Sequence, residues 1–164
     1  MKVKNVIIAF IILLLFWLLL NNSMAPEIIA SGIVASLAIA LLVCPKCDVF
    51  SELKLTPKAF VYTFIYLLVF LWELVKSNID VALRVLSPSL PINPGIVEVK
   101  TTLKSKMGRM ILANSITLTP GTFTLEMKED TLFIHWIDVK VQDVDQASKE
   151  IVRKFEKYLE VIYG

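Results

Sequence analysis

Two cysteines separated by two residues, Cys44 and Cys47, are the first candidates for chemistry in this sequence. A Cys-x-x-Cys pair is redox-active when a helix N-terminus and a thioredoxin-like fold lower the pKa of one thiol. Here the pair follows a long apolar run instead. We therefore expect two free thiols near a membrane surface or a small disulfide, with redox or metal chemistry as the alternative. The whole chain has two cysteines and one histidine, so it cannot complete a metal site of four sulfur and imidazole ligands alone.

Two carboxylates, Glu73 and Asp80, are spaced seven residues apart in an apolar helical pattern and so share a helix face. A charged side chain at the centre of a bilayer costs about 2.5–3.5 kcal/mol by insertion scales, which makes such residues functional candidates. Lys76 follows Glu73 by three residues and lies on the same face. The pattern favours an interfacial ion pair, and a proton or cation relay is the alternative.

The single histidine, His135, lies in a predicted strand between Phe133 and Ile137 on the same face. We expect it to be a hydrogen-bonded, partly buried structural residue. The sequence offers no Ser/His/Asp set, no phosphate loop and no pair of catalytic acids. It therefore predicts a non-catalytic membrane subunit with no cofactor and no small-molecule substrate bound by this chain alone.

The composition divides the 164 residues into two unlike halves. Hydrophobic residues make up 56% of the chain, charged residues 20%, and the mean hydropathy is +0.70, which is too apolar for an ordinary soluble domain. Residues 1–75 hold 5 of the 17 basic and 4 of the 15 acidic residues, so the first half resembles a membrane anchor. The net charge of +2 comes from interspersed Lys and Glu, a pattern that does not favour nucleic-acid binding.

The anchor is predicted to cover residues 1–86, with hydrophobic segments at about 6–20, 28–43 and 59–75. The third segment continues as an amphipathic helix to residue 86, giving one helix from Pro57 to Leu86. The first two segments would span about 22–24 Å, less than the ~30 Å hydrocarbon core, so we expect neighbouring subunits or a thinned bilayer. The second segment also carries a small-residue stripe of Gly32, Ser36 and Ala40, which suits helix packing.

The distribution of basic residues gives conflicting orientations. Lysines before the first segment and between the second and third place both regions in the cytoplasm by the positive-inside rule. Three full spans would then put the C-terminal domain outside. Basic residues after the third segment, including Lys76, Arg84 and Lys100, argue the opposite.

The second half predicts a proline-rich linker at 87–95 and a small α+β domain at 96–164. The expected elements are a strand at 96–101, a helix at 104–115, strands at 122–127 and 131–139, and a closing helix after the N-cap Asp143. Thr119-Pro120-Gly121-Thr122 fits a type II turn between the first helix and the second strand. The fold class is thus an α+β membrane protein, with two or three transmembrane helices followed by a β-α-β-β-α domain.

The run Asn114-Ser-Ile-Thr-Leu-Thr-Pro-Gly-Thr122, followed by Leu132-Phe-Ile-His-Trp-Ile-Asp-Val139, resembles the E subunit of the Mrp-type (Mnh-type) multisubunit sodium/proton antiporters. The same family supplies a subunit to energy-converting hydrogenase and sulfane-reductase complexes. The Cys44/Cys47 pair is not typical of the family and suggests an added disulfide. The residues that match the family motif are Asn114, Thr117, Thr119, Pro120, Gly121 and His135.

The resemblance implies an accessory subunit of a multi-pass cell-membrane complex, with its C-terminal domain in the cytoplasm. Its partners would be other small and large membrane subunits and the lipid bilayer, and the large subunits would carry the ions. A subunit of a membrane-bound hydrogenase or sulfane-reductase complex is the alternative. A cytoplasmic domain requires either an external N-terminus or one segment that does not fully cross.

Overall fold

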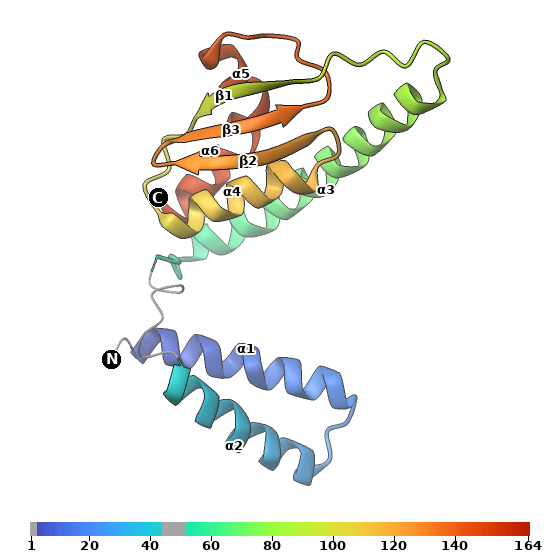
Figure 1. Ribbon diagram of the computed structural model, residues 1–164. Coiled ribbons are helices and arrows are strands. Elements are labelled where there is room, and N and C mark those ends of the chain that lie inside the picture. Colours follow the sequence, from blue (N-terminus) through green and yellow to red (C-terminus); the bar gives the residue numbers. More distant parts are fainter. Residues whose placement is uncertain (1–2, 44–51) are drawn as a thin grey trace. The chain divides into compact units, whose positions relative to one another are not determined.

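The computed structural model describes residues 3–43 and 52–164, which form two compact units, Met1–Leu53 and Lys54–Gly164 (Figure 1). Cys44 and Cys47, the predicted thiol or disulfide pair, lie outside the described residues.

The first unit contains a hairpin of two apolar helices, α1 (Val3–Asn21) and α2 (Pro26–Val43). The small-residue stripe of α2 faces α1, since Gly32, Ser36 and Ala40 are the buried residues of this helix. A Cβ on Gly32 would lie 2.5 Å from Cδ1 of Trp17, and the Trp17 indole donates to the Ile28 carbonyl over 3.0 Å. The helices have 19 and 18 residues, longer than the apolar runs alone predicted, and reach about 27–29 Å.

The second unit begins with α3, which runs from Pro57 to Leu86 as the sequence predicts. Thr56 caps it, because its hydroxyl oxygen accepts from the Ala59 backbone N–H over 3.1 Å, and Pro57 suits the first helical position. The helix ends at Ser87, whose N–H donates to the Arg84 carbonyl. All three helices α1, α2 and α3 are long and apolar enough to cross a membrane by length and composition.

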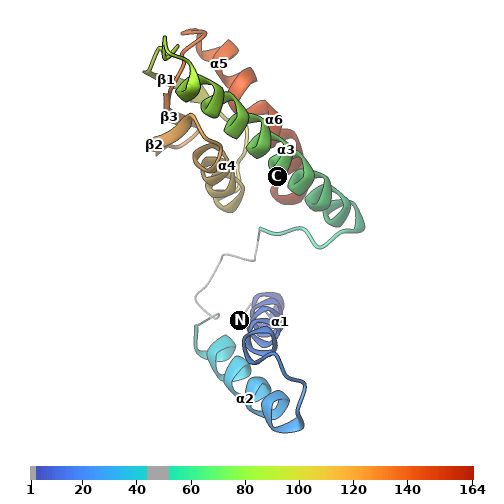
Figure 2. The same ribbon diagram turned by 90° about the vertical axis from the view of Figure 1, so that its right-hand side faces the viewer.

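A three-stranded antiparallel sheet forms the centre of the second unit. Its strands are β1 (Gly95–Lys100), β2 (Thr122–Lys128) and β3 (Thr131–Trp136), in the order β1-β3-β2, with a bulge in β2 between Thr124 and Glu126. Helices α4 (Lys106–Leu118), α5 (Val144–Ile151) and α6 (Arg153–Tyr163) lie with α3 on one side of the sheet (Figures 1 and 2). Within residues 3–43 and 52–164, no helix covers the opposite face of the sheet, which is called the open face (Figures 1 and 2).

The core lies between the sheet and these helices. Its largest fully buried side chains are Phe155, Leu112, Ile116, Leu132, Ile134 and Leu159. One carboxylate, Glu156, is also buried, and it accepts hydrogen bonds from the Thr101 hydroxyl over 2.5 Å and the Thr102 N–H over 2.6 Å. These donors compensate for the loss of water around the buried charge. Aromatic rings on α3 reach the same core, since Tyr66 and Phe70 lie 6.4 and 6.3 Å from the Phe155 ring.

The structure differs from the sequence prediction in several boundaries. Helix α4 continues to Leu118, so the first five motif residues, Asn114–Leu118, are helical. The closing helix is two helices, α5 and α6, separated at Val152, and β3 ends at Trp136 rather than at residue 139. The compact units divide between Leu53 and Lys54, not at the proline-rich linker, because α3 packs along the C-terminal elements.

The end of the linker is tied to the sheet edge. The Asn93 N–H donates to the Ile137 carbonyl over 3.1 Å, and the Val139 N–H donates to the Asn93 carbonyl over 2.8 Å. Asn93 also pairs with Asp138 as a parallel bridge. The last part of the linker is therefore held by the sheet.

Candidate functional site

A polar cavity of about 420 Å³ lies where the amphipathic half of α3 meets the Thr119–Thr122 turn. It brings together residues from the two sets that the sequence singles out: Glu73, Lys76 and Asp80 of α3, and Thr119, Pro120 and Gly121 of the family motif. Its lining comes from α3 (Glu73, Lys76, Ser77, Asp80, Arg84), the turn (Thr119, Pro120, Gly121, Thr122), the end of β3 and beyond (Trp136, Ile137, Asp138, Lys140), and α5–α6 (Glu150, Ile151, Lys154).

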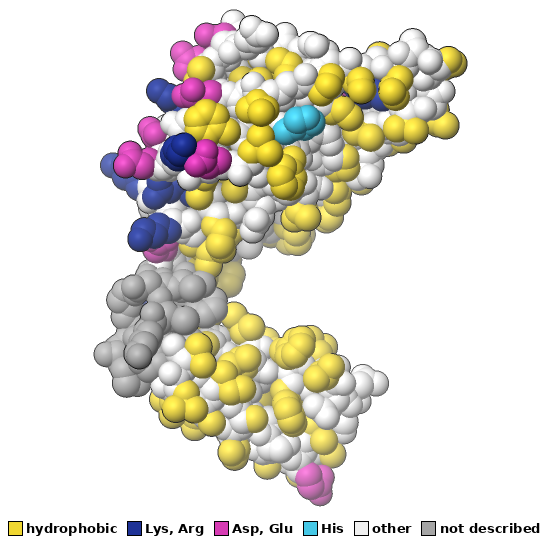
Figure 3. Space-filling view, in the orientation of Figure 1, with side chains coloured by type: hydrophobic (Ala, Val, Ile, Leu, Met, Phe, Trp, Pro, Cys, Tyr) yellow, Lys and Arg dark blue, Asp and Glu magenta, His cyan; other side chains and the backbone are white. Residues whose placement is uncertain are grey.

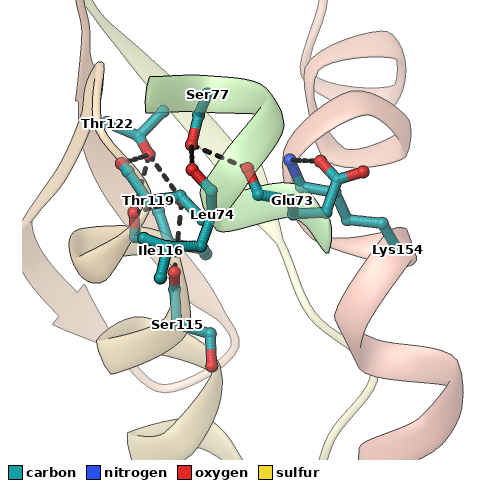
Figure 4. Close-up of polar contacts among 8 residues, drawn as sticks. All are labelled: Glu73, Leu74, Ser77, Ser115, Ile116, Thr119, Thr122 and Lys154. Atoms are coloured by element: carbon teal, nitrogen blue, oxygen red, sulfur yellow. Dashed lines mark hydrogen bonds and ion pairs between the residues drawn. The ribbon is translucent and has the colours of Figure 1, made fainter. Parts of the chain in front are cut away.

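The turn is held by the hydroxyls of its two threonines (Figure 4). The Thr119 hydroxyl donates to the Ile116 carbonyl over 2.8 Å, and the Thr122 hydroxyl donates to the same carbonyl over 2.6 Å. Gly121 has φ of +89°, as the third residue of a type II turn requires, and the Thr122 N–H donates to the Thr119 carbonyl over 3.3 Å. The predicted turn is confirmed.

The backbone of Gly121 approaches two neighbouring elements closely. A Cβ at this position would lie 3.0 Å from Cγ2 of Ile137 and 3.6 Å from Cγ2 of Val81 on α3. The glycine therefore lets the turn contact the helix directly. This contact, together with the φ of the residue, explains why the motif has glycine here.

The acidic residues of α3 make ion pairs, but with partners other than Lys76. Glu73 Oε2 lies 2.9 Å from Lys154 Nζ on α6 (Figure 4), and Asp80 Oδ2 lies 2.8 Å from Arg84 Nε. Arg84 also reaches Asp138 Oδ2, with its Nη2 at 2.9 Å. The pairs Glu73–Lys154 and Arg84–Asp138 thus join α3 to α6 and to the sheet edge.

The cavity is balanced in charge. Its lining includes four acidic residues (Glu73, Asp80, Asp138, Glu150) and four basic residues (Lys76, Arg84, Lys140, Lys154). Within residues 3–43 and 52–164, no group of three or more His, Cys, Asp or Glu side chains could hold a metal ion. Each carboxylate of α3 has a cationic side chain beside it. This arrangement is suited to holding α3 against α6 and the sheet edge.

The motif residues in α4 have separate roles. Thr117 Oγ1 accepts from the Thr124 N–H over 3.2 Å and so ties the helix to β2, whereas Asn114 is exposed. Sequence reasoning did not single out Ser115, which is buried and hydrogen-bonds the Tyr66 hydroxyl of α3. A small polar residue on the buried face of α4 was the available signal, but its partner lies 49 residues away.

His135 lies elsewhere and is exposed, so the expectation of a partly buried histidine is wrong. It occupies the open face of the sheet, in register with Ile96 on β1 and Phe123 on β2. Figure 3 shows the histidine at the surface among hydrophobic side chains. The reason is that the helices cover only the other face, where Leu132 and Ile134 are buried.

The fold and the site define a class: a membrane-anchored α+β subunit whose domain is fastened to a long apolar helix. The sequence matches the family described as Na+/H+ ion antiporter subunit over residues 10–162. The chain therefore belongs to the E-subunit family of the Mrp/Mnh-type sodium/proton antiporters.

Individual relatives agree with this family. The chain is 39% identical over 88 residues to the Na(+)/H(+) antiporter E subunit of Alkalihalophilus pseudofirmus, an alignment that covers 54% of this chain and 56% of that relative. It is 30% identical over 155 residues to the E1 subunit of the Na(+)/H(+) antiporter of Staphylococcus aureus (strain bovine RF122 / ET3-1), covering 87% of this chain and 92% of that one.

A solved structure is also similar over almost the whole chain. It is a chain of the membrane-bound sulfane sulfur reductase, an archaeal respiratory membrane complex. The identity is 46% and the TM-score 0.86, and the match covers 98% of this chain and 99% of that chain.

Proposed function

We propose that this chain is a non-catalytic accessory subunit of a multisubunit cation/proton antiporter module in the cell membrane. Its domain would lie on the cytoplasmic side and hold neighbouring membrane subunits in place. This proposal rests on the contacts that the threonines of the motif turn and the ion-paired residues of α3 make. Both serve contacts among α3, α4, α6 and the sheet of this chain.

The same contacts weigh against an ion relay through this chain. A relay needs carboxylates whose charge is available to the moving ion. Glu73 has Lys154 at 2.9 Å, and Asp80 has Arg84 at 2.8 Å. Because each carboxylate already has a cation beside it, we assign a structural role in the cavity to Glu73, Lys76 and Asp80. Ion movement is assigned to partner subunits.

The cytoplasmic location of the domain is supported by charge. Twelve of the 17 basic residues follow residue 75, including Lys76 and Arg84 on α3. The positive-inside rule counts lysines and arginines within about 15–20 residues of the end of a membrane segment, and Lys76, Arg84 and Lys100 are among those that lie this close to α3.

The proposal is tested with Glu73→Gln in the assembled complex. We expect a lower yield of intact complex in mild detergent, because the Lys154 ammonium loses its partner, but unchanged cation/proton exchange per assembled complex in inverted vesicles. The matched control is Glu126→Gln, since Glu126 pairs with Lys128 at the exposed hairpin, away from the cavity. A selective loss of ion flux in a fully assembled complex would overturn the accessory role.

A second candidate is a subunit of a redox-coupled respiratory complex. The observation that favours it is the 46% identity over 98% of the chain to the sulfane sulfur reductase chain, which exceeds the identities to the antiporter subunits. Mass spectrometry of the proteins that copurify with the chain distinguishes the two. Iron–sulfur or nickel–iron subunits would indicate the redox complex, and their absence beside large antiporter subunits would indicate the stand-alone antiporter.

A further inference from the structure

Helix α3 carries a continuous apolar stripe along its full length. The residues of this stripe follow one another at spacings of one to four, mostly three or four, and so occupy one face of the helix. Each is between 46% and 79% exposed. Thirty residues make the helix about 45 Å long. The α3 stripe consists of Phe60, Phe64, Leu67, Leu68, Leu71, Trp72, Val75, Ile79, Leu83 and Leu86.

The opposite face of α3 packs on the α+β domain from one end to the other. Near its start, the Tyr62 ring lies 6.4 Å from Tyr158 of α6. At its middle, Glu73 pairs with Lys154. Near its end, Arg84 pairs with Asp138 beyond β3. The helix therefore has two faces with different surroundings, one apolar and exposed, one covered by the domain.

Helix α3 cannot cross a bilayer alone, because the domain is packed on its covered face. If residues 59–79 of α3 crossed the hydrocarbon core, α6 would have to enter the core beside them. Helix α6 carries the charged residues Arg153, Lys154, Glu156, Lys157 and Glu160. Burying these charges in hydrocarbon is strongly unfavourable. An orientation parallel to the membrane surface avoids this, because the domain stays in water while the α3 stripe meets lipid.

We propose that α3 lies in the interface of the bilayer, with the α3 stripe inserted among the lipid chains, and that the chain crosses the membrane only twice, through α1 and α2. Interfacial helices combine an apolar face of this kind with charges along its border. Lys58 and Lys76 are exposed and stand about five turns apart on one edge of the stripe. Both lie at the border between the stripe and the covered face, since Lys58 Nζ is 5.7 Å from the Tyr62 ring centroid and Lys76 lines the polar cavity. Lysines at such a border can reach anionic phosphate headgroups.

The side chains of the α3 stripe suit lipid better than another helix. Where this chain packs helix on helix, it uses small residues: Gly32 and Ala40 of α2 let α1 approach closely. The α3 stripe consists of Phe, Leu, Ile, Val and Trp, which fill the disordered acyl region without a fixed partner. The chain also keeps α3 near the membrane, because the thirteen residues between Val43 and Pro57 reach at most ~45 Å.

Two crossings resolve the conflict among the basic residues. The N-terminal lysines, Lys54 and Lys58 before α3, and the basic residues of the domain then all lie on one side. The turn between α1 and α2, residues 22–25, has no basic residue and lies on the other side. This arrangement satisfies the positive-inside rule at every position. It holds for either parent complex, so it does not depend on the proposed function.

The test measures the depth of the α3 stripe in the membrane. Single cysteines are introduced as Phe64→Cys, Leu71→Cys, Ile79→Cys and Leu83→Cys in the full chain, with Cys44→Ser and Cys47→Ser. The protein is spin-labelled in its native complex and reconstituted in vesicles of phosphatidylethanolamine and phosphatidylglycerol. Collision rates with oxygen and with a water-soluble nickel chelate give the depth of each label. Lys128→Cys, at an exposed hairpin residue, is the control.

We expect all four labels to meet oxygen several-fold more than nickel, at one shallow depth, and the control to show the reverse. A depth that increases to a maximum in mid-series and then decreases would mean that α3 spans, and would overturn the proposal. Immobile labels that meet neither reagent would mean that a partner protein covers the α3 stripe, and would also overturn it. Independently, tags at the two chain ends must react with an impermeant reagent from the same side of the vesicle.

Discussion

Helices α2 and α3 are both apolar enough to cross a membrane, with mean hydropathy of 2.1 and 1.7 over their most apolar windows, but different side chains make up most of their packed faces. Helix α2 buries Gly32, Ser36 and Ala40 against another apolar helix. Helix α3 turns aromatic and charged side chains, among them Tyr66 and Glu73, towards the α+β domain. Hydropathy thus does not separate the two helices, whereas the side chains on their packed faces do.

The largest expected effect comes from removing the aromatic anchor of α3. Phe155→Ala deletes a fully buried ring that contacts Tyr66 and Phe70 of the helix. We expect the free energy of unfolding of the second unit to fall by about 3–5 kcal/mol, as for other buried Phe→Ala changes. Denaturant unfolding of the full chain in micelles, followed by tryptophan fluorescence, measures this.

The control for this change is Phe123→Ala, since Phe123 is exposed on the open face of the sheet. An equal loss of stability in both variants would mean that the α3 contact with the domain is no stronger than a surface contact. The proposed difference between α2 and α3 would then be wrong for α3, because its packed face would not hold it to the domain.

The second prediction tests whether the small residues of α2 hold it against α1. Gly32→Leu places a side chain where a Cβ alone would lie 2.5 Å from Trp17. We expect the α1–α2 hairpin to be destabilised by about 1–3 kcal/mol, the usual cost of overpacking. The measurement is the thermal stability of the full chain in detergent, with Ala30→Leu on the exposed side of α2 as the control.

A double variant sharpens this prediction. Trp17→Ala combined with Gly32→Leu restores space between the helices and should recover part of the lost stability. If the combined variant is less stable than the sum of the single changes implies, the close approach at Gly32 is not what positions α1 on α2.

The third prediction concerns the turn that joins the motif to α3. Gly121→Ala forces a Cβ onto a residue with φ of +89° and to within 3.0 Å of Ile137. We expect a loss of about 1–2 kcal/mol in the free energy of unfolding of the second unit. Asn114→Ala is the matched change within the motif. Because Asn114 is exposed in a helix, this change should leave stability unaltered or slightly raised.

Local signals in the sequence explain which parts of the fold could be predicted. The bounds of α3 follow from Thr56-Pro57 at its start and Ser87-Pro88 at its end, and the turn follows from Pro120-Gly121. The break between α5 and α6 at Val152 has no such signal. Its cause is tertiary, since α5 packs on β1 while α6 packs on α3.

The same limit applies to the candidate site. Spacing along one helix predicts only neighbours three or four residues away, so Lys76 was the natural partner for Glu73. The actual partner, Lys154, is 81 residues distant in the sequence. Lys154 comes within reach only because α3 and α6 lie side by side in the folded unit.

The smallest expected effect is the coupling between Glu73 and Lys154. Their side chains are 18% and 33% exposed, so water and salt screen the pair in part. A double-mutant cycle with Glu73→Gln and Lys154→Met should give a coupling energy of about 0.5–1 kcal/mol that decreases as salt increases. If α3 lay in hydrocarbon, salt ions could not reach this pair, and the coupling would be larger and independent of salt. A weak, salt-sensitive coupling is therefore what an α3 helix at the membrane surface requires, and the cycle tests that geometry from the domain side of the helix.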